Sequence, residues 1–133
     1  MHVVVHAERK LTDLDFARLT KLADEQLPLA FSEMLDVVEV VPRHDIPTDL
    51  VTMNSRIEIV DVHTSRRHEL TICYPRDADP SVGLISVLSP VGSSLIGLKV
   101  CDVARWLAPN GEDCAAQIVA IQYRPEDHSD DNR

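Results

Sequence analysis

The stretch ISVLSPVGSSLIGL, residues 85–98, decides the fold class because it joins a short strand to a capped helix. Residues 90–98 suit a short helix with Pro90 at its first position, where a missing N–H costs nothing. Ser89 is the expected N-cap, since its hydroxyl can accept a hydrogen bond from the first turn. Two glycines flank the paired serines of this helix, and they indicate close packing on a sheet.

Segments on both sides of this stretch predict the rest of the sheet. RIEIVDV alternates between apolar and polar residues, and ELTICY pairs back on it as a hairpin. The Asn110-Gly111 turn predicts a second hairpin, whose last strand, AAQIVAIQY, is apolar enough to be central. The expected strands are residues 56–62, 69–74, 84–88, 101–107 and 115–123. This order predicts an α+β fold, with an antiparallel β-sheet wrapped over one short helix.

The N-terminal third carries helical periodicity instead. Thr12 is a good N-cap, and Leu11 and Phe16 have the spacing of a hydrophobic staple around it. Pro28 ends this first helix near residue 26 and suits the first turn of a second helix. Two helices joined by so short a connection predict an antiparallel helical hairpin, a short coiled-coil arm. His2 to His6 are expected to be extended, because VVV favours a strand.

These elements predict three parts of the chain. The junction VVPRHDIP contains two prolines and polar residues, which is typical of a linker. We therefore expect a helical arm over 1–44 and a sheet domain over 45–125. The remaining residues, 126–133, predict an acidic, disordered tail.

Charge and cysteine content limit the classes of function. The chain has 133 residues and a formal net charge of −9, whereas nucleic-acid binding requires clustered Lys and Arg. Direct binding of DNA or RNA is therefore not expected, and an acidic regulator would contact basic protein surfaces. No apolar run is long enough to cross a membrane. Three cysteines without CxxC spacing indicate reduced thiols, and hence a cytoplasmic protein.

No constellation predicts catalysis or a bound cofactor. His63 and His68 flank a turn, but two histidines without a clear third ligand make a poor zinc site. Ser93 and Ser94 lack the GxSxG setting of a nucleophile. The pair Asp24-Glu25, near the tip of the arm, could hold a divalent ion if a partner supplied further oxygens. The alternative is that this pair simply lies at a solvated helix end. The helix dipole disfavours acids at the C-terminal end of a helix, which argues against a functional pair.

Four segments resemble a known family: DLVTMNSRIEI (49–59), TICYP (71–75), ISVLSPVGSSLIGL (85–98) and AIQYRPED (120–127). Together they resemble the Rnk family, the regulators of nucleoside diphosphate kinase, which are relatives of the Gre transcript-cleavage factors. The resemblance covers about residues 12–126. It implies an FKBP-like fold for the sheet domain, without prolyl isomerase activity.

The resemblance also implies a partner and a docking site. Gre factors dock on RNA polymerase at the rim of its secondary channel, and an Asp-Ser-Pro segment before a short helix is a main contact. The matching positions here are Leu88, Ser89 and Pro90, so an apolar residue replaces the acid. The arm is too short to carry Asp24 and Glu25 to a deep active site, so transcript cleavage is not implied. We expect a monomeric, non-enzymatic regulator that competes with Gre-type factors and affects nucleoside diphosphate kinase levels.

Two alternatives and one departure from the family stay open. The chain could bind nucleoside diphosphate kinase directly, or it could be an FKBP-type prolyl isomerase, for which it offers few aromatic residues. Where relatives tend to read GLRVGD, this chain reads GLKVCD, with Cys101 at the glycine position. If that glycine has a positive φ, Cys101 is strained, and a rearranged turn or an exposed thiol follows.

Overall fold

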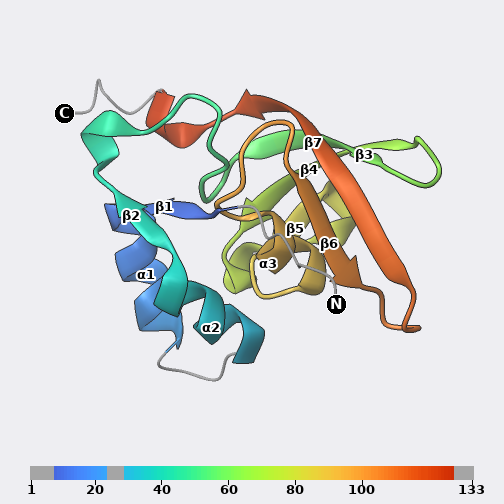
Figure 1. Ribbon diagram of the computed structural model, residues 1–133, viewed down its shortest axis with the longest axis horizontal. Coiled ribbons are helices and arrows are strands. Elements are labelled where there is room, and N and C mark those ends of the chain that lie inside the picture. The colour runs from blue at the N-terminus through green and yellow to red at the C-terminus, as the bar shows by residue number, and fades with distance from the viewer. Residues whose placement is uncertain (1–7, 24–28, 128–133) are drawn as a thin grey trace, which may run out of the picture.

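A curled sheet of five strands forms the main body of the computed structural model, which describes residues 8–23 and 29–127 (Figure 1). The strand order is β5-β4-β3-β7-β6. The strands are β3 (Arg56–Asp61), β4 (Arg67–Cys73), β5 (Leu84–Ser86), β6 (Val103–Leu107) and β7 (Asp113–Tyr123). The structure contains both helices and strands, with only a few helices, and this agrees with the predicted fold class.

Both predicted hairpins are confirmed. β3 pairs with β4 in antiparallel register, with Glu58 opposite Glu69, and β6 pairs with β7 around the Asn110-Gly111 turn. β7 has a neighbour on each side, which agrees with its apolar sequence. Its pairing with β3 shifts register on both sides of the Ile57–Glu58 step. Such bulges bend strands, and they account for the curl of the sheet.

The prediction of a wholly antiparallel sheet is wrong at one edge. β5 pairs with β4 in parallel register, with Ile72 opposite Ile85. The segment between them carries two single turns of 3-10 helix, η2 (Pro75–Asp77) and η3 (Pro80–Val82), and it returns the chain so that Leu84 lies opposite Thr71. Gly83 closes this return with φ +83°, a conformation that favours glycine.

The N-terminal part contains the two predicted helices and two strands that were not predicted. Thr12 caps α1 (Asp13–Ala23), because its Oγ1 accepts a hydrogen bond from Asp15 N at 2.9 Å. The second helix is α2 (Leu29–Val37). Strands β1 (Lys10–Thr12) and β2 (Glu39–Val41) flank the helices and pair in parallel. The expected extended segment at His2–His6 and the connection at 24–28 lie outside the described residues, and the hairpin geometry stays a prediction.

One hydrophobic core joins the helices to the sheet. Phe31 of α2 and Leu19 of α1 are buried together with Ile57, Ile72 and Ile118 of the sheet. The described arm residues therefore pack on the sheet, and apolar burial of this kind contributes about 2 kcal/mol for each large side chain. The FKBP-like character of the sheet domain stays a prediction.

The C-terminal boundary differs from the expected one. Glu126 and Asp127 were assigned to a disordered tail, yet they belong to a turn of 3-10 helix, η4 (Pro125–Asp127). A further such turn, η1 (Arg43–Asp45), lies in the predicted linker. Among the described residues, no helix is long and apolar enough to cross a membrane.

Candidate docking surface

The helix α3 (Pro90–Leu95) begins as the sequence predicted. Ser89 Oγ accepts a hydrogen bond from Gly92 N at 3.0 Å, and the same hydroxyl donates to Ser86 O at 2.7 Å. Pro90 takes the first helical position and is exposed. The two bonds of Ser89 fix the direction in which the chain enters the helix, so Pro90 is presented in one orientation.

Leu88 lies half-buried beside this cap. Its side chain packs against the hydrophobic core, and its N–H donates to Ser86 Oγ at 3.0 Å. Leu88 and Ser89 are half-buried, and Pro90 is exposed. The Gre-type Asp-Ser-Pro segment has an acid at the position that corresponds to Leu88. An acid at this position would have to leave the apolar contact and reach solvent, because burying an unpaired carboxylate is costly.

Gly92 explains how α3 lies so close to the sheet. A Cβ atom added at Gly92 would come within 2.0 Å of Ser86 O and 2.9 Å of the Val87 Cα. No larger residue fits without moving the helix. The close packing that the sequence predicted for the glycines of this helix is confirmed at this position.

Arg9 holds the other end of α3, a contact that was not predicted. Arg9 Nη1 donates to Ser93 O at 2.6 Å and to Ile96 O at 3.3 Å, across 84 and 87 positions of the chain. Lys10 N donates to Gly97 O at 3.0 Å in the same region. Cations favour the carbonyl end of a helix, so the N-terminal segment stabilises the helix that starts at Pro90.

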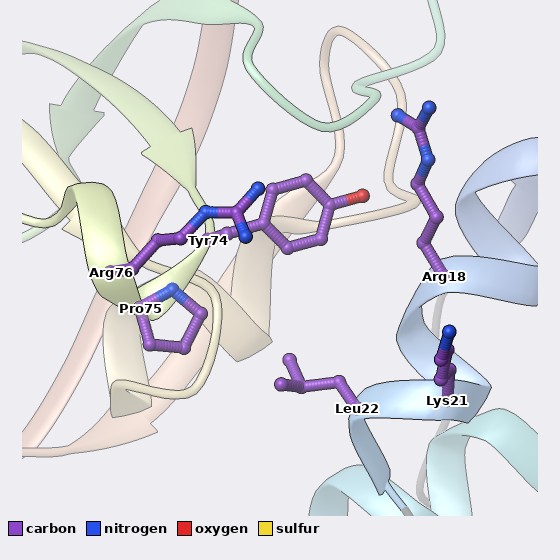
Figure 2. A pocket seen from close by; sticks show the side chains of 6 residues that line it. All are labelled: Arg18, Lys21, Leu22, Tyr74, Pro75 and Arg76. Carbon is purple, nitrogen blue, oxygen red and sulfur yellow. The ribbon is translucent and has the colours of Figure 1, made fainter.

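A groove of about 650 Å³ opens between α1 and the end of β4 (Figure 2). Its lining comprises Arg18, Lys21, Leu22, Tyr74, Pro75 and Arg76. Tyr74 is the one aromatic residue among them. A prolyl isomerase pocket would require a more aromatic, enclosed cavity, so the groove does not favour that alternative.

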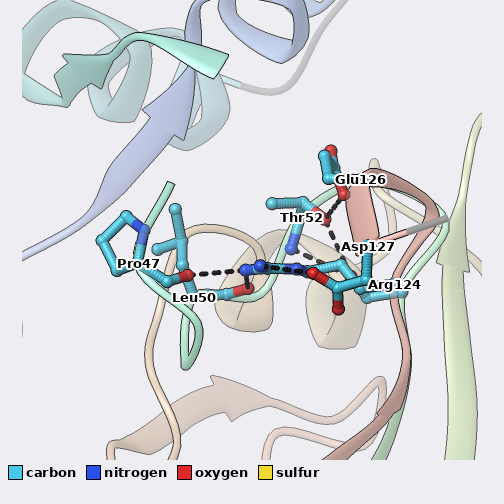
Figure 3. Close-up of polar contacts among 7 residues, drawn as sticks. Pro47, Leu50, Thr52, Arg124, Glu126 and Asp127 are labelled. Atoms are coloured by element: carbon cyan, nitrogen blue, oxygen red, sulfur yellow. Dashed lines mark hydrogen bonds and ion pairs between the residues drawn. The ribbon is translucent and has the colours of Figure 1, made fainter. Parts of the chain in front are cut away.

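The closing sequence motif, RPED, forms a buried polar network (Figure 3). Arg124 is only 3% exposed, and its guanidinium donates to Pro47 O at 2.6 Å and Leu50 O at 3.1 Å. It also pairs with the Asp127 carboxylate at 2.9 Å. These contacts join the C-terminal end to the loop that precedes β3. Since a buried guanidinium without partners would be very unfavourable, the network fixes this loop.

The same loop contains the motif VTMNSR, which carried much of the resemblance. Thr52 Oγ1 donates to Glu126 Oε1 at 2.7 Å and lies 2.9 Å from Ser55 Oγ. Asn54 turns the chain with φ +66°. The VTMNSR and RPED motifs are therefore parts of one structural unit.

Comparison with known proteins decides the family. The model of the family described as "Transcription elongation factor, GreA/GreB, C-term" matches residues 46–123, more than half of the chain. The chain belongs to the GreA/GreB family. The match begins where the Arg124 network holds the loop and ends with β7, so it spans the sheet and α3.

Two curated relatives refine this assignment. The GreA/GreB family member described here is 31% identical over 122 residues to the "Regulator of nucleoside diphosphate kinase" of Escherichia coli strain K12, covering 87% of this chain and 90% of that protein. It is 37% identical over 78 residues to the "Transcription elongation factor GreA" of Acetivibrio thermocellus, covering 59% of this chain and 49% of that protein. The predicted resemblance to the Rnk family is confirmed.

Solved structures agree with this placement. A "Prokaryotic transcription elongation factor GreA/GreB" from Nitrosomonas europaea superposes with a TM-score of 0.74 at 34% identity, covering 89% of this chain and all of that one. GreA factor homolog 1 of Thermus thermophilus has a TM-score of 0.51 at 18% identity, which shows a shared fold alone.

The remaining candidate residues have the following places in this GreA/GreB family member. Asp24 and Glu25 lie outside the described residues, so a role at the arm tip stays a prediction. His63 and His68 are exposed, and residues 8–23 and 29–127 contain no cluster of potential metal ligands. Cys101 is exposed with φ +83°, so this chain has both the strained backbone and the exposed thiol expected at that position.

Proposed function

We propose that this chain is a non-enzymatic transcription regulator that binds RNA polymerase near its secondary channel. Leu88, Ser89 and Pro90 form the contact, and occupancy of the channel mouth competes with Gre-type factors. An effect on nucleoside diphosphate kinase levels follows through transcription. The relatives that support this proposal are named as a regulator and as elongation factors, and these names do not describe an enzymatic activity.

The main support for this proposal is that Pro90 is exposed at the first position of a helix whose two ends are both held by hydrogen bonds. Ser89 fixes the entrance through Ser86 and Gly92, and Arg9 binds the carbonyls near the exit. A rigid contact of this kind binds with little loss of conformational entropy. The acidic charge of the chain favours a basic protein surface as its partner.

A double substitution of the contact tests the proposal. Ser89→Ala with Pro90→Ala should abolish binding to core RNA polymerase and should relieve competition with GreA. Loss of the cap costs about 1 kcal/mol of stability, so the urea midpoint should be measured on the same samples. Undiminished binding would reject the docking surface.

Ser94→Ala is the matched control. Ser94 lies in the same helix, is buried, and donates its hydroxyl to Val91 O at 2.7 Å. Its loss removes one buried hydrogen bond within α3 and leaves the Ser89 cap, Pro90 and the Arg9 contact in place. We expect this variant to keep its affinity for the polymerase.

Direct binding to nucleoside diphosphate kinase is the second candidate, because a relative at 31% identity is named for regulating that enzyme. Capture of both purified proteins on the immobilised chain separates the two candidates. Retention of the kinase in the absence of polymerase, with loss on substitution at Pro90, would favour direct contact. Retention of the polymerase alone would favour the transcriptional route.

A further inference from the structure

The groove between α1 and the end of β4 gathers positive charge in an acidic protein (Figure 2). Arg18 and Lys21 stand one turn apart on α1, and Arg76 faces them from η2. The chain as a whole carries a net charge of −9. Three basic side chains from two distant segments therefore line one groove, although the chain as a whole is acidic.

These cations are not used by ion pairs of the described chain. The salt bridges present there join Lys10 to Glu39, Arg67 to Glu58 and Arg124 to Asp127. Arg18, Lys21 and Arg76 take no part in them, and all three are exposed. Their charge is thus available to a ligand in the groove.

Tyr74 adds a donor at the inner wall. Its hydroxyl is buried and has no hydrogen-bond partner among the described residues, although the Arg18 guanidinium lies close by (Figure 2). Burial raises the pKa of Tyr74, and the nearby Asp15 carboxylate raises it further. The phenol is therefore neutral at physiological pH and can donate to an anion.

One acid opposes anion binding at this place. Asp15 lies near both Arg18 and Tyr74, but it is 3% exposed, and its carboxylate accepts a hydrogen bond from Met53 N at 3.0 Å. It faces the core rather than the solvent. The exposed guanidinium and ammonium groups are consequently the charges that a ligand in the groove meets first.

We propose that this groove binds a small phosphate-bearing polyanion, such as a polyphosphate or a nucleoside polyphosphate. Arginine binds phosphate oxygens through paired N–H donors, which suits Arg18 and Arg76 on opposite walls. The volume of about 650 Å³ lies within the range of small-molecule sites. Leu22 and Pro75 supply apolar lining beside the cations.

Size distinguishes this ligand from an acidic protein segment. A protein partner would cover surface beyond the groove, where the excess of acidic residues would repel it. A small anion meets only the local charges, because charges more than about 8 Å away are largely screened at physiological salt. The groove thus favours a compact anion with several charges.

Isothermal titration calorimetry with inorganic tripolyphosphate and with ATP, at about 50 mM salt, tests the proposal. We expect saturable binding of at least one probe to the intact chain. Arg18→Gln with Arg76→Gln should weaken it about tenfold or more, because two charge-assisted contacts are lost. Tyr74→Phe should weaken it about threefold, the effect of one hydrogen bond.

Arg67→Gln with Arg105→Gln is the matched control, since both residues are exposed arginines on strands outside the groove. It makes the same change in net charge and should retain binding within about twofold. Equal affinity for both probes would support phosphate as the recognised group, and tighter ATP binding would support a nucleoside polyphosphate.

Three results would overturn the proposal: no saturable binding of either probe, equal weakening by the control variant, or tighter binding of a Glu-rich peptide than of tripolyphosphate. The groove lining includes none of Leu88, Ser89 and Pro90. Ser89→Ala with Pro90→Ala should therefore leave tripolyphosphate binding unchanged, even where polymerase binding fails.

Discussion

The Asp15 carboxylate on α1 accepts a hydrogen bond from Met53 N at 3.0 Å, and this bond joins the helical segment to the loop that precedes β3. Both residues are at most 3% exposed. The pKa of Asp15 is raised to about 6, mainly by burial and also by the neighbouring Glu126, while the Met53 hydrogen bond and Arg18 act in the opposite direction. The contact therefore contains a carboxyl group that titrates within two units of neutral pH.

The stability of the fold should depend on the ionisation of Asp15. Because its pKa is higher in the folded state than the usual 3.8, the folded state binds more protons between pH 4 and 6. Asp15 therefore lowers the free energy of unfolding as the pH rises through that window. Between pH 4.5 and 7 its contribution should fall by about 2 kcal/mol.

Asp15→Asn should remove this dependence, because the amide oxygen can still accept from Met53 N but does not ionise. Urea unfolding at several pH values should show wild type gaining stability relative to the variant on acidification. Asp36→Asn, an exposed acid of α2, serves as the control and should follow wild type. Parallel curves for wild type and Asp15→Asn would contradict the prediction.

Cys101 should be a site of easily gained stability. Its φ of +83° is unfavourable for any residue with a Cβ, and the turn is held by hydrogen bonds from Cys101 N to Ile118 O and from Gln117 Nε2 to Cys101 O. Cys101→Gly relieves about 1–2 kcal/mol of backbone strain in the folded state. Part of this gain in stability is lost, because glycine makes the unfolded chain more flexible.

We expect Cys101→Gly to raise the free energy of unfolding by about 1 kcal/mol. The urea midpoint at unchanged m-value measures this. Cys101→Ala keeps the strain and removes only an exposed thiol, so its stability should stay within about 0.5 kcal/mol of wild type. Equal gains in both variants would show that the thiol, rather than the backbone, is unfavourable.

The parts that the sequence predicted correctly are those set by neighbours in the chain. The caps Thr12 and Ser89 each bond an N–H three residues on, and the hairpin turns join adjacent strands. Strands β1 and β2 have three residues each, too few to alternate, and their pairing depends on two intervening helices. The role of Arg9 was not predicted for the same reason, because its hydrogen-bond acceptors lie 84 and 87 positions away in the sequence.

Family resemblance supplied what periodicity could not. The Leu88-Ser89-Pro90 segment was structurally an N-cap followed by a proline, and only the resemblance made it a candidate contact. The basic groove was not predicted by either route, because Arg18 and Arg76 come together only when α1 packs beside the end of β4.

Arg9 should influence polymerase binding without belonging to the contact. Arg9→Met removes two charge-assisted hydrogen bonds, to Ser93 O and Ile96 O, while retaining most of the side-chain volume. We expect a loss of about 2 kcal/mol of stability and faster amide hydrogen exchange in α3. Affinity for core polymerase should fall severalfold as the helix loosens.

Arg56→Met is the control, since Arg56 is an exposed arginine of β3. It should leave both the exchange rates in α3 and the polymerase affinity unchanged. Unaltered exchange in the Arg9 variant would show that α3 is held by its core packing alone.

Leu88→Asp should restore the ionic component that the Gre-type Asp-Ser-Pro segment implies. Leu88 is half-buried against the core, so the substitution costs about 1 kcal/mol of stability. A rim charge of this kind contributes about 1 kcal/mol to binding, so affinity for core polymerase should rise about fivefold. The gain should shrink with added salt, because the new attraction is screened.

Leu107→Asp is the control that distinguishes the effect of position 88 from the effect of an added negative charge. Leu107 lies on the edge strand β6, is 59% exposed, and would carry the same new acid outside the Leu88-Ser89-Pro90 segment. We expect no gain in affinity from it. A matching rise in both variants would indicate a general electrostatic effect, and weaker binding by Leu88→Asp would mean that the partner meets Leu88 as an apolar contact.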